Sequence, residues 1–171
     1  MRRKIAYWLS LPVRWFHRRG FGAHSPWAYE FITEALYCQY RYYIFEELNG
    51  TKADEQLFCI NNWLNVKDVV MHCENGITKA YLVAPLRRDE LKRSDFTVYY
   101  YDTDHFEELK LDVEGKAFDR KSCVIIDGFL DKNTDVWIKL LSQKDVTTVF
   151  DTGRRGIVFF DPQRQKQTYL T

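Results

Sequence analysis

The sequence has little of what metal centres and redox enzymes require. It holds four cysteines and four histidines among 171 residues. No two cysteines form a C-x-x-C pair, so neither a structural zinc site nor a dithiol redox motif is indicated. H-E-x-x-H and H-x-H do not occur, and we expect no metal site. G-x-G-x-x-G and G-x-S-x-G are missing too, so the sequence carries neither the dinucleotide fingerprint nor the nucleophile elbow.

Long apolar runs are missing as well, and none reaches the length that a membrane-spanning helix needs. The opening stretch MRRKIAYWLSLPV has a basic start and nine mostly apolar residues. Pro12, Arg14 and Arg18 follow at once, however, and no small-residue cleavage site appears. This pattern argues against a signal peptide. Together with the unpaired cysteines, it predicts a reduced, cytoplasmic protein.

Apolar and aromatic residues, in contrast, are plentiful. Hydrophobic residues make up 46% of the chain and aromatic residues 16%, which is enough for a packed core and argues against wholesale disorder. The length suits one domain with an added arm. The net charge of +1 names no partner by itself.

The first 19 residues carry six positive charges and no acid, and since the whole chain carries +1, the other 152 residues carry −5. The cations are Arg2, Arg3, Lys4, Arg14, Arg18 and Arg19. Lys and Arg beside tryptophan suit an anionic membrane surface, whereas six charges are few for a nucleic-acid partner. The segment can instead dock on the mildly acidic body, and we expect Trp8, Trp15 or Trp27 to bury its ring there.

Residues 1–50 are expected to form a helical arm with a turn in its middle. Residues 3–11 have the spacing of a short helix, which Pro12 should interrupt. Gly20 and Gly22 then allow the chain to bend.

A second helix is expected after this bend. Ser25 followed by Pro26 is typical of a helix start, with serine as the N-cap and proline at the first helical position. Apolar residues repeat at helical spacing to about residue 37.

From residue 51 onward, helices and strands alternate. Helical spacing predicts helices at 53–64, 77–84 and 133–143, and short apolar runs predict strands at 66–73, 96–102 and 122–128. Residues 146–151 and 156–161 should pair as an antiparallel hairpin, with Gly153 or Gly156 at a positive φ. Alternating strands and helices predict an α/β fold with a mostly parallel sheet, in which one reversed strand lies at or near an edge.

Candidate site residues follow the three expected parallel strands, because ligands of open α/β sheets bind at the carboxyl ends of strands. The stretch HCENG contributes His72, Glu74, Asn75 and Gly76, and its backbone N–H groups could meet an anion at a helix start. Asp102 follows the second strand and Asp127 ends the third. The plain alternative is that HCENG is an ordinary turn, Asp102 a solvated acid and Asp127-Gly128 a turn signal.

Two stretches resemble a known family. FGAHSPWAYEFITEAL is similar to the HG-x-HSPF start of a group of bacterial class I S-adenosylmethionine-dependent methyltransferase-like proteins. CVIIDGF, with the later VTTVFDTGRRGIVFFDPQRQKQ, resembles the last strand, helix and hairpin of that group. LFCINNWLNVKDVVMHCENGITKAYLVA looks like its first strand and cofactor loop. The resemblance implies a Rossmann-like domain over residues 51–171 and S-adenosylmethionine as cofactor.

The chain departs from that family where the cofactor would bind. The first strand of the family ends in E-x-G-x-x-x-G; aligned on Gly76, this chain has Val70 for the acid and His72 for the first glycine. The acid would hold the ammonium group of the cofactor, and the glycine would allow the backbone to approach closely. Asp102 remains as a ribose acid, and Glu74 could supply the missing carboxylate. With 19 residues between Asp102 and Ser122, the domain also looks shortened.

Three hypotheses result. The first is a degenerate, non-catalytic methyltransferase-like protein that serves as a binding or partner module. The second is an active methyltransferase that acts on a small molecule, which requires Gly76 and Asp102 to line one pocket. The third, compatible with either, is contact with an anionic membrane or a nucleic acid through the basic arm, the nucleic acid being disfavoured.

Overall fold

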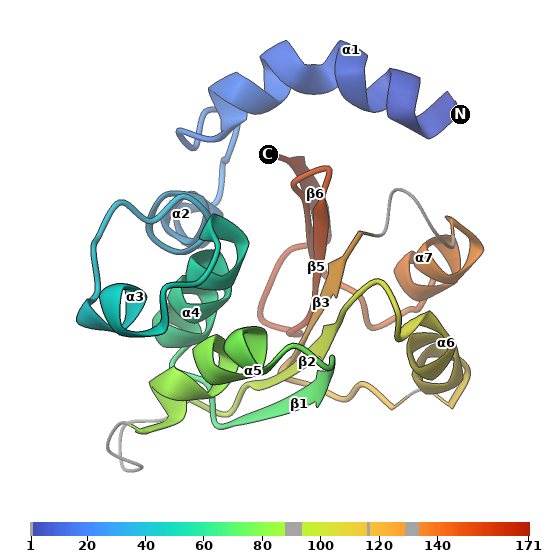
Figure 1. Cartoon of the computed structure of the whole chain (residues 1–171). Coiled ribbons are helices and arrows are strands. Elements are labelled where there is room, and N and C mark those ends of the chain that lie inside the picture. Colours follow the sequence, from blue (N-terminus) through green and yellow to red (C-terminus); the bar gives the residue numbers. More distant parts are fainter. Residues whose placement is uncertain (1, 88–93, 116, 129–133) are drawn as a thin grey trace.

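The computed structural model describes residues 2–87, 94–115, 117–128 and 134–171. A six-stranded sheet has helices on both faces, and a long N-terminal helix lies apart from these layers (Figure 1). The sheet has the order β1-β2-β3-β5-β4-β6. Its strands are β1 (Asp68–His72), β2 (Thr97–Tyr101), β3 (Ser122–Asp127), β4 (Thr148–Asp151), β5 (Arg155–Phe160) and β6 (Gln167–Leu170).

The strands pair in both directions, so the sheet is mixed. β1, β2 and β3 run parallel, and β6 is parallel to β4, but β5 is antiparallel to both of its neighbours, β3 and β4. The expectation of a mostly parallel sheet with a reversed strand at or near an edge is therefore wrong. All six residues of β5 are buried, and an apolar strand of this kind is stable in the interior of a sheet. The outer side of β4 is left for β6, whose residues alternate in exposure as an edge strand does.

The hairpin itself is confirmed. Phe150 of β4 is opposite Ile157 of β5, and the connecting turn contains Gly153 at a φ of 84°. A positive φ is strained for residues with a Cβ atom, so glycine suits this position. The α/β class and the three strands expected between residues 66 and 128 are confirmed too.

One face of the sheet is covered by helices from the first half of the chain (Figure 1). They are α2 (Pro26–Glu30), the π-helix η1 (Phe31–Leu36), α4 (Lys52–Leu64), α5 (Gly76–Val83) and the 3-10 turn η2 (Ala84–Arg87). Helix α3 (Tyr43–Leu48) packs on the outer side of α4 and α5. Ser25 caps α2 as expected, since its hydroxyl accepts a hydrogen bond from the N–H of Ala28 at 3.4 Å. Phe31, Ile32 and other residues of α2 and η1 share one core with β1, β2, β3 and β5. The division of the chain at residue 50 stays a prediction.

The opposite face is covered by α6 (Phe106–Gly115) and α7 (Thr134–Leu141). Alternate strand residues point to this side, and they form a second core that includes Tyr101, Val124, Ile126, Val158 and Phe160. The two cores explain why the strand sequences are apolar almost throughout, since both faces of the sheet are buried.

Helix α1 (Arg2–His17) is longer than expected, because it continues through Pro12. The residues that follow the proline are held by the sheet. Arg14 is 5% exposed, and its Nη1 donates to the carbonyl and carboxylate oxygens of Asp151 and, at 3.3 Å, to the carbonyl of Thr171. His17 Nδ1 lies 2.7 Å from the carbonyl of Leu170. These contacts can offset the helix hydrogen bond that a proline removes.

These contacts remove one cation from the surface of the basic arm. Arg14 is one of the six cations of the expected membrane-binding surface, but it is buried at the ends of β4 and β6 and does not face a membrane. Gly20 and Gly22 make the expected bend at φ values of 77° and 83°. Trp27 is half-buried and packs its ring against the core beside Phe31 and Phe159, so one of the three tryptophans lies against the body as expected. Among the described residues, no helix combines the length and apolar character that a membrane crossing requires.

Candidate functional site

His72, the last residue of β1, is held in place by residues of β2 and α6. The ring of His72 stacks on Tyr101 at a centroid distance of 4.6 Å, and its Nε2 lies 3.9 Å from a carboxylate oxygen of Asp112. Tyr101 donates its hydroxyl to the same carboxylate. His72 thus fills the place where the aligned family has a glycine.

The turn after β1 is a helix cap. The side-chain oxygen of Asn75 accepts the N–H groups of Ile77 and Thr78 at 2.8 and 3.2 Å, so two backbone donors at the start of α5 are already satisfied. A Cβ atom on Gly76 would meet no heavy atom within 4 Å, and its φ lies outside the left-handed region. Glu74 is exposed beside them. The geometry is that of an ordinary βα turn, as the plain alternative states.

Asp102, after β2, is engaged locally as well. Its Oδ1 accepts the backbone N–H of Asp104 at 2.9 Å and lies 2.6 Å from Nδ1 of His105. The hydrogen bond to Asp102 raises the pKa of His105 above its ordinary value. Oδ1 of Asp102 is thus occupied by residues of its own loop.

The residues that the family resemblance assigns to S-adenosylmethionine therefore offer it little. Val70 supplies no charge, the ring of His72 occupies the glycine position, and Asn75 caps a helix. A cofactor with an ammonium group needs an anion there. The arrangement does not fit the group, and we assign no methyl transfer to it.

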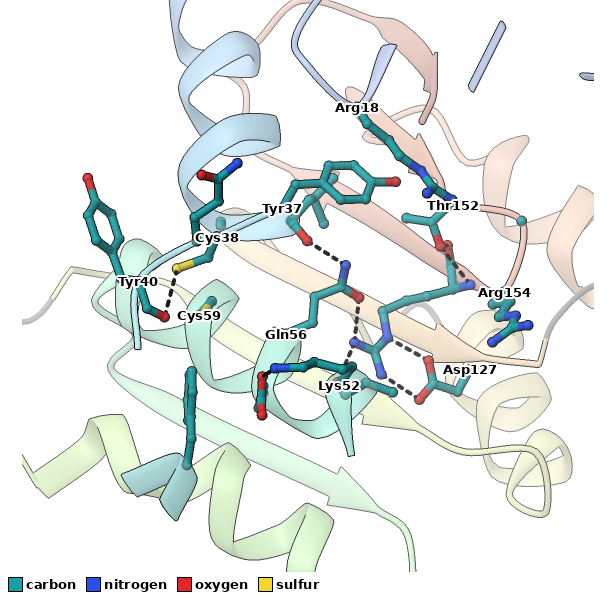
Figure 2. A pocket seen from close by; sticks show the side chains of 18 of the residues that line it. Arg18, Tyr37, Cys38, Tyr40, Lys52, Gln56, Cys59, Asp127, Thr152 and Arg154 are labelled. Atoms are coloured by element: carbon teal, nitrogen blue, oxygen red, sulfur yellow. Dashed lines mark hydrogen bonds and ion pairs between the residues drawn. The ribbon is translucent and has the colours of Figure 1, made fainter. Parts of the chain in front are cut away.

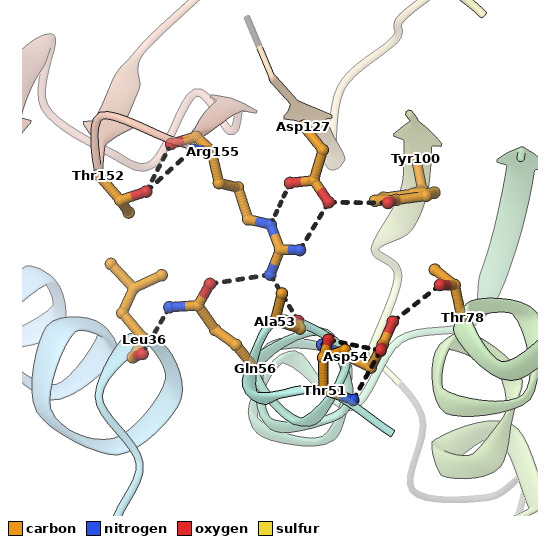
Figure 3. Close-up of polar contacts among 10 residues, drawn as sticks. All are labelled: Leu36, Thr51, Ala53, Asp54, Gln56, Thr78, Tyr100, Asp127, Thr152 and Arg155. Atoms are coloured by element: carbon orange, nitrogen blue, oxygen red, sulfur yellow. Dashed lines mark hydrogen bonds and ion pairs between the residues drawn. The ribbon is translucent and has the colours of Figure 1, made fainter. Parts of the chain in front are cut away.

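Asp127 is the exception, because it belongs to a buried network around Arg155 (Figure 3). Nε and Nη2 of Arg155 bind the two carboxylate oxygens of Asp127 at 2.6 and 2.7 Å, in the two-pronged geometry that favours arginine,. Tyr100 donates its hydroxyl to Asp127 at 2.8 Å. Nη1 of Arg155 reaches Gln56 and the carbonyl of Ala53 at 2.8 and 3.0 Å, both in α4.

This network fixes the charges of its members. Burial by itself lowers the pKa of Arg155, but Asp127 outweighs it and raises the pKa. Burial, followed by Asp127, raises the pKa of Tyr100. Arg155 therefore stays charged and Tyr100 stays a hydrogen-bond donor, so neither is suited to act as a base.

A cavity of about 1160 Å³ opens beside this network (Figure 2). It is lined by residues of four segments, namely 35–41 between η1 and α3, 52–59 of α4, 127–128 after β3 and 152–155 of the hairpin turn, together with Arg18 and Phe45. Its position at the carboxyl ends of β3 and β4 is where ligands of α/β sheets bind. Of the six residues singled out from the sequence, Asp127 alone lines it.

The lining of the cavity has an excess of positive charge. Asp127 is paired with Arg155, and Glu55 lies 2.5 Å from Lys52. Three arginines then remain beyond these pairs, Arg18, Arg41 and Arg154, all exposed at the cavity. Arg18 lies over the ring of Tyr37 at 5.4 Å. Aromatic and apolar walls with arginines at the rim suit an anionic molecule.

Sequence reasoning missed this cavity and its arginines. The adjacent Arg154 and Arg155 in the turn TGRR, and Arg18 in the opening basic stretch, were the available signals. They lie in separate segments, so their convergence depends on the fold.

Within the part of the chain that the structure describes, no group of three or more His, Cys, Asp or Glu side chains is placed to hold a metal ion. No protein-family model, no curated protein and no solved structure matches the chain.

Proposed function

We propose that the protein is a non-catalytic binding module, built on a shortened Rossmann-like, methyltransferase-like frame, that holds a small anionic molecule in the cavity beside Arg155. The cavity is the observation that carries the proposal. The resemblance of FGAHSPW and of the C-terminal hairpin to the methyltransferase-like family supports the frame. The local engagement of Asn75 and Asp102 supports the loss of catalysis.

The network around Arg155 supplies a rigid wall for such a ligand. Asp127, Gln56 and the carbonyl of Ala53 satisfy the buried guanidinium, so Arg155 positions the cavity and leaves ligand binding to the exposed arginines. Arg41 comes from the segment before α3 and Arg154 from the hairpin turn. Either arginine could donate charge-assisted hydrogen bonds to a phosphate or carboxylate in the cavity.

The ligand should also have an apolar or aromatic part. Leu36, Tyr37 and Phe45 line the cavity beside the arginines. The volume of about 1160 Å³ is slightly larger than that of ordinary small-molecule sites, which span about 300–1,000 Å³.

Calorimetric titration of the full chain tests this proposal. AMP and phenyl phosphate should bind at least tenfold more tightly than adenosine and phenol. Arg154→Gln should weaken AMP binding about ten- to a hundredfold, since a hydrogen bond to a charged group contributes about 1.5–3 kcal/mol. Arg120→Gln, a change of another exposed arginine just before β3, should leave binding unchanged. Equal binding of charged and neutral probes, or no binding at millimolar concentration, would overturn the proposal.

S-adenosylmethionine and its demethylated product are separate arms of the same titration. We expect weak binding or none, because no carboxylate stands at position 70. Micromolar affinity that Asp102→Ala abolishes would restore the active methyltransferase.

A second candidate function is contact with an anionic membrane through α1, and one observation favours it. Leu9, Val13 and Phe16 recur at helical spacing and are exposed, Leu9 by 77%. Trp15 and Phe21 are exposed near them. Such an apolar face on a basic helix is typical of interfacial helices.

Vesicle sedimentation tests this candidate. The full chain should sediment with vesicles rich in phosphatidylserine and much less with neutral phosphatidylcholine vesicles. The double variant Leu9→Ser, Phe16→Ser should lose the binding, whereas Leu111→Ser, which removes another exposed leucine, from α6, should keep it. Binding that the double variant retains would exclude α1 as the contact.

A further inference from the structure

Two cysteines lie close together in the wall of the cavity. Cys38 packs against the small apolar cluster that contains Cys59, and both residues line the cavity. The thiol of Cys38 donates to the carbonyl oxygen of Tyr40 at 4.0 Å. Figure 2 shows the two sulfur atoms beside the segment that leads to Tyr40. The remaining cysteines, Cys73 and Cys123, are buried and belong to the core against the sheet.

The two thiols of the pair differ in access. Cys38 is half-buried at the cavity, whereas Cys59 is buried inside α4. Burial, followed by the interaction with Cys38, raises the pKa of Cys59, so Cys59 is the less reactive of the two toward peroxide. A dissolved oxidant therefore reacts first with Cys38, and Cys59 lies behind it as a resolving thiol.

We propose that Cys38 and Cys59 are a redox modification site, at which hydrogen peroxide converts the two thiols into a disulfide. The thiolate of Cys38 attacks one peroxide oxygen, so that an S–O bond forms, the O–O bond breaks and hydroxide leaves to become water. The sulfur of Cys59 then attacks the sulfenic sulfur of Cys38. An S–S bond forms, the S–O bond breaks, and the proton of Cys59 leaves with the second water. Two thiols and one peroxide thus give one disulfide and two waters.

The local structure allows the two sulfurs to approach. A disulfide requires the two sulfurs to lie about 2.05 Å apart, so one of them must move toward the other. Cys59 is fixed in α4, but Cys38 lies in the irregular segment 38–42 between η1 and α3. This segment can shift without breaking a helix, so the movement falls on Cys38.

The bond would change one wall of the cavity. It would tie segment 38–42, which carries Arg41, to α4, which carries Gln56 and Cys59. We expect the amide hydrogens of residues 38–42 to exchange at least tenfold more slowly in the oxidised protein. This effect belongs to the chain alone and does not depend on a ligand.

Alkylation and mass spectrometry test the proposal on the full chain. After treatment with hydrogen peroxide and denaturation in N-ethylmaleimide, two of the four cysteines should be alkylated, and the digest should contain one cross-linked peptide pair, Cys38 with Cys59. When dithiothreitol reduces the protein before N-ethylmaleimide is added, all four cysteines should be alkylated. Cys59→Ser should instead leave Cys38 as a sulfenic acid that dimedone traps.

The double variant Cys73→Ser, Cys123→Ser is the matched control, and it should form the same disulfide. Should these substitutions or Cys59→Ser prevent folding, the peptide map of the unmodified protein still decides the question. Four alkylated cysteines after peroxide treatment, or a cross-link that includes Cys73 or Cys123, would overturn the proposal.

Discussion

The carboxyl ends of β1 and β2 differ from the carboxyl end of β3 in how their polar residues are used. At the first two, Asn75 caps the helix that follows it, and Asp102 binds His105 three residues away. At β3, Asp127 binds Arg155, which in turn binds Ala53, 102 residues earlier in the chain. The first region is satisfied by its own neighbours, and the second gathers distant segments around a cavity.

This difference shows where the fold leaves room for a ligand. Short-range hydrogen bonds close the turn after β1 and leave its donors occupied. At β3, the contacts of Arg155 join distant segments that together line a cavity. In this chain the cavity lies where the polar network connects distant parts of the fold.

The largest expected effect concerns the buried pair at β3. Arg155→Met removes the partner of the Asp127 carboxylate, and the free energy of unfolding should fall by about 3–5 kcal/mol. Denaturation in urea measures this loss. Asp102→Asn, at β2, should cost less than about 1 kcal/mol, because its partner His105 is near the surface,.

The double variant Arg155→Met, Asp127→Leu is the control for this comparison. With both charges removed, most of the lost stability should return. If Arg155→Met alone costs no more than Asp102→Asn, the contrast between the two regions fails.

A smaller effect is expected from the pair of His105 and Asp102 after β2, which should make the free energy of unfolding depend on pH. The hydrogen bond to Asp102 raises the pKa of His105 above 6.5, so the folded state favours the charged imidazole. The resulting stability is present below pH 6.5 and is lost as the pH rises through the folded-state pKa.

This loss can be measured by comparing the free energy of unfolding of the unmodified protein with that of His105→Asn at low and high pH. The difference between the two proteins should be about 0.2–1 kcal/mol larger at pH 5.5 than at pH 9. Asp102→Asn should remove the same pH dependence, and a dependence that persists in this variant would place the partner of His105 elsewhere.

The smallest effect is expected at Gly76, the first residue of α5. Gly76→Ala adds a Cβ atom that meets no heavy atom within 4 Å, and alanine favours helices more than glycine does. The variant should be more stable by a few tenths of a kcal/mol, which a careful urea titration resolves. A loss above 1 kcal/mol would mean that the turn after β1 needs glycine for packing.

Much of the fold could be predicted from local patterns. Ser25-Pro26 marked the start of α2, apolar runs marked β1 to β3, and Gly153 marked the hairpin turn. Helix α6 was not predicted, although the helical spacing of Phe106, Leu109 and Val113 indicates it.

Other features depend on contacts that no local pattern specifies. A hairpin turn fixes β4 beside β5 but does not say which of them meets β3, so the interior position of β5 was not predictable. Likewise, Pro12 suggested the end of a helix, but the binding of Arg14 to Asp151 comes from a segment 137 residues away. The cavity arises in the same way from four segments.

The contact of Arg14 with Thr171 also orders events during synthesis. Helix α1 is made before the strands of the sheet, and the carbonyl that Arg14 binds belongs to a residue 157 positions later. At about 5–20 residues per second, roughly 8–30 s pass between the synthesis of the two residues. Arg14 therefore reaches its buried position, where it is 5% exposed, only after the last strand of the sheet has been made.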